Sequence, residues 1–136
     1  MSLSPLQQRM IDASVNRRLL LVEDDPLLRD ALVLLLENSG FAVHEAGNGA
    51  AALRTAAEHR PDLMLLDLGL PDMAGLDVVR QLKADPITAG IIVLAVTGRA
   101  GSEERTRCLS AGCDGYLVKP VPPRELVRVI REKLGN

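Results

Sequence analysis

Two short apolar runs in this 136-residue chain end in carboxylates, the side chains best suited to chemistry here. Glu23 and Asp24 follow the run 19–22, and Asp67 follows the run 63–66. Such runs are typical of buried strands of a parallel sheet, and open α/β sheets place their ligand sites at the carboxyl ends of these strands. Because clustered carboxylates raise one another's pKa unless a cation joins them, the sequence predicts a Mg²⁺ site.

Two further strand ends supply groups that suit phosphoryl chemistry. Thr97 follows the run 91–96 and offers a hydroxyl, and Lys119 follows 115–118 and offers a compact positive charge. A carboxylate such as that of Asp67 can act as a nucleophile toward phosphorus, and a metal, an ammonium and hydroxyl donors stabilise phosphoryl transfer. The residues therefore favour a phospho-accepting aspartate, although Thr97 could instead cap the segment that follows it.

Strand and helix patterns alternate along the chain from the first apolar run onward. The predicted strands are 19–22, 42–46, 63–66, 91–96 and 115–118, and the predicted helices run from Pro26 to Ser39-Gly40, over 49–59, 76–84 and 103–111, and from Pro122-Pro123 onward. Right-handed crossovers must place helices on both faces of a parallel sheet. We therefore predict an α/β fold of the (βα)5 type, with helices on both faces of a parallel sheet.

The composition excludes several classes of function. Apolar residues make up 47% and charged residues 25%, with a formal net charge of -2, so the chain has no basic footprint for nucleic acid. Phe41 and Tyr116 are the two aromatic residues, too few for base stacking. Cys108 and Cys113 fit neither a metal-ligand pattern nor a disulfide framework. No stretch is long and apolar enough to span a membrane, and we expect a cytoplasmic protein.

Four sequence segments together resemble the response-regulator receiver domain of two-component signalling. They are LLVEDDP (20–26), LLDLGLPDMAGLD (65–77), AVTG (95–98) and GYLVKP (115–120). Each segment is weak evidence, but all four occur in order and at the ends of the right strands. The resemblance covers roughly residues 17 to 134. It implies a flavodoxin-like doubly wound sandwich with strand order 2-1-3-4-5. We expect a receiver domain at 17–136 and an extension or linker at 1–16, of which residues 1–3 are compatible with an expression vector.

The resemblance implies a role for each acid at the site. Asp67 would be the phosphorylation site, Asp24 would coordinate Mg²⁺ directly, and Glu23 would do so through water. The backbone carbonyl of Gly69 would supply a further ligand. Lys119 would pair with the phosphoryl group.

The resemblance also implies a conformational switch. Thr97 would move toward the phosphoryl group, and Tyr116 would change rotamer with it. The Lys119-Pro120 bond would be cis, an isomer that X-Pro bonds adopt at low energetic cost.

The resemblance implies partners as well. A sensor histidine kinase or histidine phosphotransfer protein would donate the phosphoryl group, and the domain would catalyse its own phosphorylation and dephosphorylation without an external substrate. The output would appear at the face formed by 103–111, 115–118 and the last helix. That face would control a downstream protein or a fused output domain, or form a homodimer; we expect no direct nucleic-acid or membrane contact.

Two alternatives belong to other classes. A haloacid-dehalogenase-type phosphohydrolase also uses a strand-end aspartate, Mg²⁺, a hydroxyl and a lysine, but it normally has a second acid where this chain has Gly69. A purely structural partner-binding module would not respond to BeF₃⁻ with Mg²⁺. Dinucleotide binding is disfavoured because acids, and no glycine-rich loop, follow the first strand.

Overall fold

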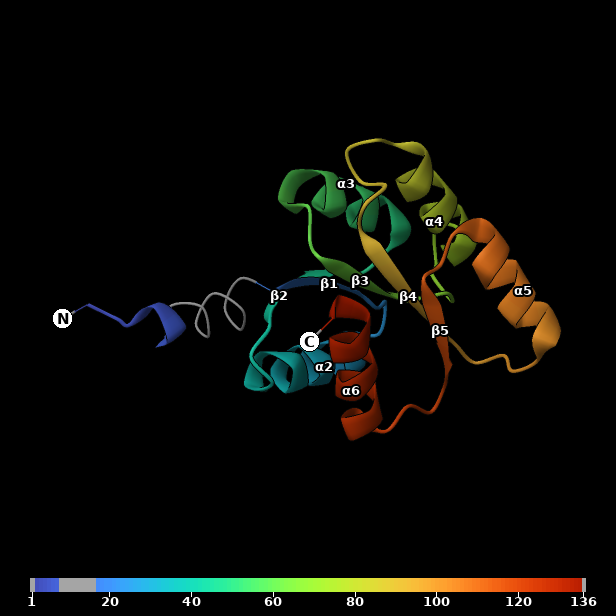
Figure 1. Cartoon of the computed structure of the whole chain (residues 1–136). Coiled ribbons are helices and arrows are strands. Elements are labelled where there is room, and N and C mark those ends of the chain that lie inside the picture. Colours follow the sequence, from blue (N-terminus) through green and yellow to red (C-terminus); the bar gives the residue numbers. More distant parts are fainter. Residues whose placement is uncertain (1, 8–16, 136) are drawn as a thin grey trace.

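From Arg18 onward, five strands and five helices alternate in the computed structural model, which describes residues 2–7 and 17–135 (Figure 1). The strands are β1 (Arg18–Val22), β2 (Ala42–Ala46), β3 (Leu63–Asp67), β4 (Ile92–Thr97) and β5 (Gly115–Val118). The helices are α2 (Pro26–Asn38), α3 (Gly49–His59), α4 (Gly75–Ala84), α5 (Ser102–Ala111) and α6 (Pro123–Leu134). The sequence placed each of these elements correctly, with small differences at their ends.

The strands form one parallel sheet in the order β2-β1-β3-β4-β5, which confirms the predicted topology. The central strand β3 is buried along its whole length. Strand β2 lies at an edge, as expected from His44 and Glu45, two polar residues within it. The polar strand is tolerated there because an edge strand has one neighbour and is covered less completely.

Helices cover both faces of the sheet, with α2 and α6 on one face and α3, α4 and α5 on the other (Figure 1). Successive side chains of a strand point to opposite faces. Leu19 and Leu21 of β1 therefore pack in the core beneath α2 and α6, whereas Leu20 and Val22 pack in the core beneath α3, α4 and α5. This two-sided burial explains why the strands read as continuous apolar runs.

Polar side chains fix the helix starts nearest the acidic strand end. The Asp25 carboxylate caps α2 by accepting from the backbone N–H groups of Leu27 and Leu28 at 3.0 and 3.5 Å. Asn48 caps α3 by accepting from the N–H of Ala51 at 2.8 Å. The caps satisfy backbone donors that a helix leaves free at its start, and they hold the loops after β1 and β2.

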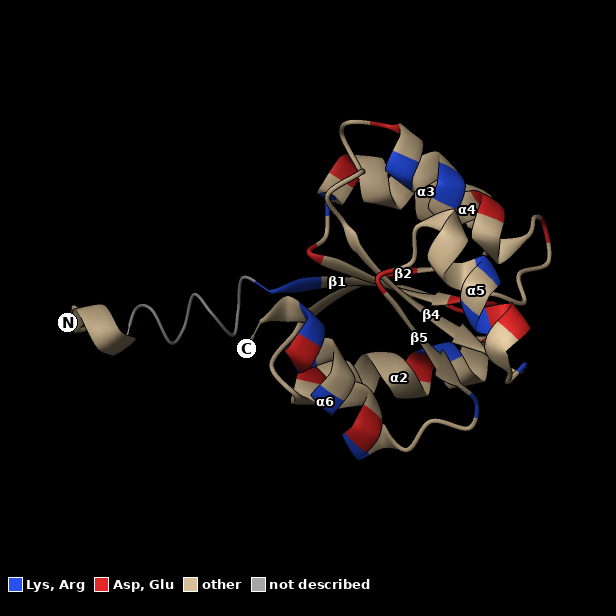
Figure 2. Ribbon diagram, turned by 45° about the vertical axis from the view of Figure 1, so that its right-hand side comes forward, with Lys and Arg blue, Asp and Glu red and all other residues tan. Residues whose placement is uncertain are grey.

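The surface carries charges of both signs. Figure 2 shows Lys and Arg beside Asp and Glu on the outer faces of α5 and α6. On α6, Arg128 pairs with Glu125 at 2.6 Å and with Glu132 at 2.9 Å, so part of the basic charge of this helix is neutralised within it. Within the described part of the chain, no helix combines the length and hydrophobicity that crossing a bilayer requires.

The structure describes part of the predicted N-terminal extension. Residues 5–7 are helical, and Ser4 and Gln7 exchange backbone–side-chain hydrogen bonds of 2.9 and 3.1 Å. The rest of the extension, residues 8–16, lies outside the described residues. The division into 1–16 and 17–136 remains a prediction.

Candidate functional site

The parallel register brings the ends of four strands to one edge of the sheet. Val22 at the end of β1 lies opposite Leu66, so the residues that follow them are neighbours. Asp67 at the end of β3 lies opposite Val96 of β4. Thr97 accepts a hydrogen bond of 2.8 Å at its backbone carbonyl from the N–H of Lys119, beyond the end of β5. The strands thus assemble at one edge the acids, the hydroxyl and the ammonium that the sequence assigned to one site.

Three carboxylates converge at this edge. Oxygen atoms of Glu23, Asp24 and Asp67 all lie within 4.8 Å of one another. Glu23 and Asp67 are buried, with 3% and 9% of their surface exposed, whereas Asp24 is exposed. A compact set of oxygen ligands with one open side suits Mg²⁺, which prefers carboxylate oxygens and keeps several waters. The donor set therefore fits the predicted metal.

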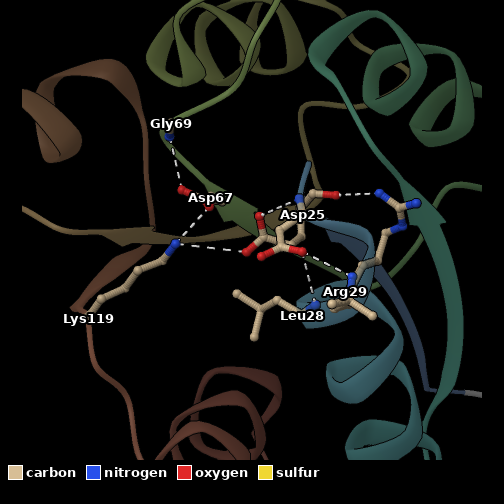
Figure 3. Close-up of polar contacts among 8 residues, drawn as sticks. Asp25, Leu28, Arg29, Asp67, Gly69 and Lys119 are labelled. Carbon is tan, nitrogen blue, oxygen red and sulfur yellow. Dashed lines mark hydrogen bonds and ion pairs between the residues drawn. The ribbon is translucent and has the colours of Figure 1, made fainter.

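Lys119 and Gly69 hold the two oxygens of the Asp67 carboxylate (Figure 3). Lys119 Nζ donates to Oδ2 at 2.8 Å, and the Gly69 N–H donates to Oδ1 at 2.9 Å. Burial acts to raise the pKa of Asp67, but the hydrogen bonds from Lys119 and Gly69 outweigh it, so this pKa lies below its ordinary value. The carboxylate is therefore held ionised and oriented.

The same ammonium lies near the buried acid of β1. Lys119 Nζ is 3.8 Å from Glu23 Oε1. Burial would lower the pKa of Lys119, but its hydrogen bond and charge interaction with Asp67 raise it overall. One ammonium therefore serves two buried carboxylates and stays charged.

The pKa of Glu23 responds to the burial of its carboxyl group and to the neighbouring negative charge. Burial raises its pKa to about 7, the N–H of Asp25 partly opposes the shift, and the negative charge of Asp67 adds to it. The Asp25 N–H donates to Glu23 Oε2 at 3.2 Å. A divalent cation at the cluster would relieve this repulsion.

Thr97 lies between the acidic site and helix α5. Its hydroxyl accepts from the N–H of Arg99 at 3.1 Å and donates to Glu104 Oε1 at 3.4 Å. The contact with Arg99 is the local capping role considered for Thr97. The contact with Glu104 links Thr97 to α5, and nothing in the sequence indicated it. Thr97 is 4% exposed, so its hydroxyl is held within the protein.

The remaining predicted switch residue, Tyr116, lies on β5 opposite Ala95 and is half-buried against the core beneath α3, α4 and α5. The Lys119-Pro120 bond is cis, as predicted. Ligation by the Gly69 carbonyl and movement of Tyr116 remain predictions. Cys108 and Cys113 are buried free thiols, in agreement with the sequence analysis.

The loop after Asp67 is fixed by two contacts that the sequence did not reveal. The Asp72 carboxylate accepts from the N–H groups of Gly49 and Ala50 at 2.8 and 3.0 Å, which joins this loop to the start of α3. A Cβ at Gly75 would lie 2.7 Å from Leu68 Cα. Gly75 is thus needed for close packing.

Arg29 is a further residue near the site that the sequence analysis missed. Its Nη1 donates to the backbone carbonyl of Glu23 at 2.8 Å (Figure 3). A clue was available, because Arg29 lies one helical turn after Asp25, the residue that caps α2, on a helix that leaves the acidic strand end directly.

Comparison with known proteins agrees with this geometry. The model of the response regulator receiver domain family matches residues 19–131. The DNA-binding response regulator MtrA of Mycolicibacterium smegmatis is 40% identical over 121 residues, which are 89% of this chain and 52% of MtrA. The transcriptional regulatory protein KdpE of Mycobacterium tuberculosis is 43% identical over 112 residues, 82% of this chain and 48% of KdpE. The chain spans about half the length of these curated relatives.

Two solved structures share the fold. The CheY-like receiver domain protein of Methanospirillum hungatei superposes with a TM-score of 0.81 and 34% identity, covering 88% of this chain and 94% of that one. The receiver domain of a sensor histidine kinase from Pseudomonas aeruginosa gives a TM-score of 0.80 and 32% identity, with coverages of 88% and 98%. Its structure has a magnesium ion coordinated in the active-site cleft. These matches argue against the phosphohydrolase alternative.

Proposed function

The chain belongs to the response regulator receiver domain family of two-component systems, and on that basis we propose that Asp67 accepts a phosphoryl group with Mg²⁺ bound beside it. The observation that carries the proposal is the position of Lys119, whose Nζ lies 2.8 Å from Asp67 Oδ2 within the carboxylate cluster. This arrangement provides a nucleophile and a positive charge at one strand edge.

The chemistry proposed for Asp67 follows from the state of its carboxylate. The hydrogen bonds from Lys119 and Gly69 keep it ionised, so an oxygen lone pair is available to phosphorus. A new P–O bond forms as the bond between phosphorus and the donor's imidazole nitrogen breaks. Lys119 can then pair with the phosphoryl oxygens as negative charge moves onto the site.

The proposed metal ligands are Asp67, Asp24 directly, Glu23 through water, and the backbone carbonyl of Gly69. Bound Mg²⁺ would neutralise carboxylate charge and stabilise phosphoryl oxygens. The compact oxygen cluster of this chain and the magnesium in the Pseudomonas aeruginosa receiver both support this assignment.

The proposed response begins at Thr97, whose hydroxyl can leave Glu104 for a phosphoryl oxygen and release a contact to α5. Tyr116 on β5 would change rotamer with it. The conformational equilibrium would then shift at the face formed by α5, β5 and α6, the face that the sequence analysis assigned to output.

The proposed partners are a sensor histidine kinase or histidine phosphotransfer protein as donor, and a downstream protein or fused output domain as target. A homodimer through α5, β5 and α6 is a further proposed output. We propose a cytoplasmic setting, in which Cys108 and Cys113 would stay reduced, and no direct contact of this domain with nucleic acid. Catalysis would be limited to the domain's own phosphorylation and dephosphorylation.

Mass spectrometry after incubation with acetyl phosphate and Mg²⁺ tests the proposal, with wild type beside Asp67→Asn. We expect one phosphoryl adduct in wild type and none in the variant. An adduct retained by Asp67→Asn would overturn the site. If wild type shows no adduct, BeF₃⁻ with Mg²⁺ separates the remaining readings: a spectral change at the site indicates a short-lived phosphoryl group, and no change indicates a partner-binding module.

A further inference from the structure

An apolar cavity of about 500 Å³ opens beside the carboxylate cluster and extends between the sheet and helices α2 and α6. Its apolar wall includes Leu21, Leu32, Leu65, Val96, Val121 and Leu126. Its volume falls in the range of small-molecule sites, about 300–1,000 Å³, and such sites combine apolar walls with a few polar groups.

The cavity is lined by short aliphatic side chains. The chain has two aromatic residues, Phe41 and Tyr116, and neither lines this cavity. Val121 follows the Lys119-Pro120 pair in the loop that leads from β5 to α6 and is half-buried. A larger side chain at this loop position would occupy the space directly.

The cavity has a polar end and an accessible side. The polar end is lined by Glu23 and Asp67 of the carboxylate cluster and by Lys119. Leu28 in the first turn of α2 also lines the cavity and is 39% exposed, and the Lys119 side chain is 37% exposed. A small molecule can therefore reach the apolar space past these two side chains, which Figure 3 shows beside the carboxylates.

The charge at the polar end selects the head group of a ligand. Three carboxylates, counting Asp24 at the outer side, face one ammonium, and that ammonium already donates to Asp67 at 2.8 Å. Because the carboxylates outnumber the ammonium, an anionic head would be repelled at this end, whereas a cationic head would pair with a carboxylate oxygen. An alkyl body would meanwhile bury its methylene groups against the aliphatic wall.

We infer that this cavity is a binding site for small hydrophobic amines, with the alkyl group between α2 and α6 and the ammonium at Glu23 and Asp67. The inference goes beyond the proposed function, because binding requires no phosphoryl group. Since the ammonium and Mg²⁺ use the same carboxylates, the two ligands compete. A hydrophobic amine would thus act as an antagonist of metal binding at this site.

Titration calorimetry of the metal-free protein with n-butylamine and n-hexylamine tests the inference. We expect saturable binding that strengthens about fourfold per added methylene. Hexanoate and 1-hexanol, which share the alkyl chain, should bind at least about tenfold more weakly than hexylamine, because they lack the cationic head. Mg²⁺ should raise the apparent dissociation constant of hexylamine.

Val121→Phe provides the decisive variant, because the ring fills the cavity without touching a carboxylate. It should weaken hexylamine binding at least about tenfold and leave Mg²⁺ binding intact. Val43→Phe is the matched control, since Val43 is a half-buried residue of β2 that does not line the cavity. This variant should bind hexylamine as tightly as wild type does. Methyl chemical-shift mapping on wild type gives a readout that does not depend on how the variants fold.

Any of four results would overturn the inference. The first two are absence of saturable binding, and hexanoate binding as tightly as hexylamine. The other two are hexylamine binding of equal strength in wild type and a folded Val121→Phe variant, and chemical shifts that map away from Leu28, Leu32 and Val121. Absence of amine binding in wild type, together with normal Asp67 phosphorylation, would reject this inference alone and leave the proposed function standing.

Discussion

Arg29 joins the acidic strand end to the edge strand through Glu45. Its Nε lies 3.2 Å from Glu45 Oε1, while its Nη1 donates to the backbone carbonyl of Glu23 at 2.8 Å. The Glu45 side chain is 46% exposed, so the ion pair itself adds little stability. The contact instead positions the metal ligands, because the planar guanidinium fixes the backbone that carries Glu23 and Asp24.

We predict that Arg29→Lys weakens Mg²⁺ binding about tenfold, the lower end of the range for residues that orient metal ligands. Lysine presents a point charge and cannot hold the Glu23 carbonyl and the Glu45 carboxylate in the same fixed geometry. Mg²⁺ titration followed by calorimetry measures the effect. The control is Arg54→Lys on the exposed side of α3; equal affinities in the two folded variants would remove Arg29 from this role.

Gly75→Ala should destabilise the fold by about 1–3 kcal/mol, the usual effect of forcing extra volume into a packed site. The new Cβ would lie 2.7 Å from Leu68 Cα and 2.8 Å from Leu68 Cδ2, and the backbone atom cannot move aside easily. Urea unfolding gives the free energy. Gly90→Ala is the matched control, because no heavy atom lies within 4 Å of its added Cβ. A similar effect of both substitutions would contradict the packing argument.

His44 should make stability depend on pH. Its ring stacks on His59 with centroids 3.9 Å apart and an interplanar angle of 15°. Burial, followed by the charges of His59 and Arg18, lowers the pKa of His44 below its ordinary 6.5. The unfolded chain then binds the proton more tightly, so this contribution is complete above pH 6.5 and is lost as the pH falls through the lower, folded pKa.

The measurement is urea unfolding of wild type and His44→Gln at pH 7.5 and at pH 5.5. The carboxylates of the protein respond to pH in both proteins and cancel in the comparison. Wild type should lose more stability on acidification than the variant. An equal loss would show that the stacked pair does not respond to protonation.

The sequence sufficed for the fold and for most of the site because both depend on local patterns. Continuous apolar runs marked buried parallel strands, and polar residues directly after them had to meet at one sheet edge. This reasoning brought Asp67 and Lys119 together across 52 positions, as the structure shows. It required no knowledge of side-chain conformations.

The contacts that escaped prediction depend on how far individual side chains reach. Arg29 meets the Glu23 carbonyl, and Asp72 meets the start of α3, because of loop conformations that no periodic pattern records. The stacking of His44 on His59 also has no signature in the sequence, and the structure shows both rings half-buried. They lie on β2 and α3, and their pairing follows from the packing of that helix against the edge of the sheet.

A substitution at Thr97 should separate the phosphorylation of Asp67 from the conformational response of α5. Thr97→Ala removes the hydroxyl that contacts Glu104 at 3.4 Å but leaves Asp67, Lys119 and the acidic cluster in place. We therefore expect Asp67 to accept a phosphoryl group in this variant, with at least a severalfold smaller change in α5. Hydrogen exchange of α5 with and without BeF₃⁻ and Mg²⁺ measures that change. Thr97→Ser keeps the hydroxyl and should behave as wild type; a full α5 response in Thr97→Ala would assign the coupling to other contacts.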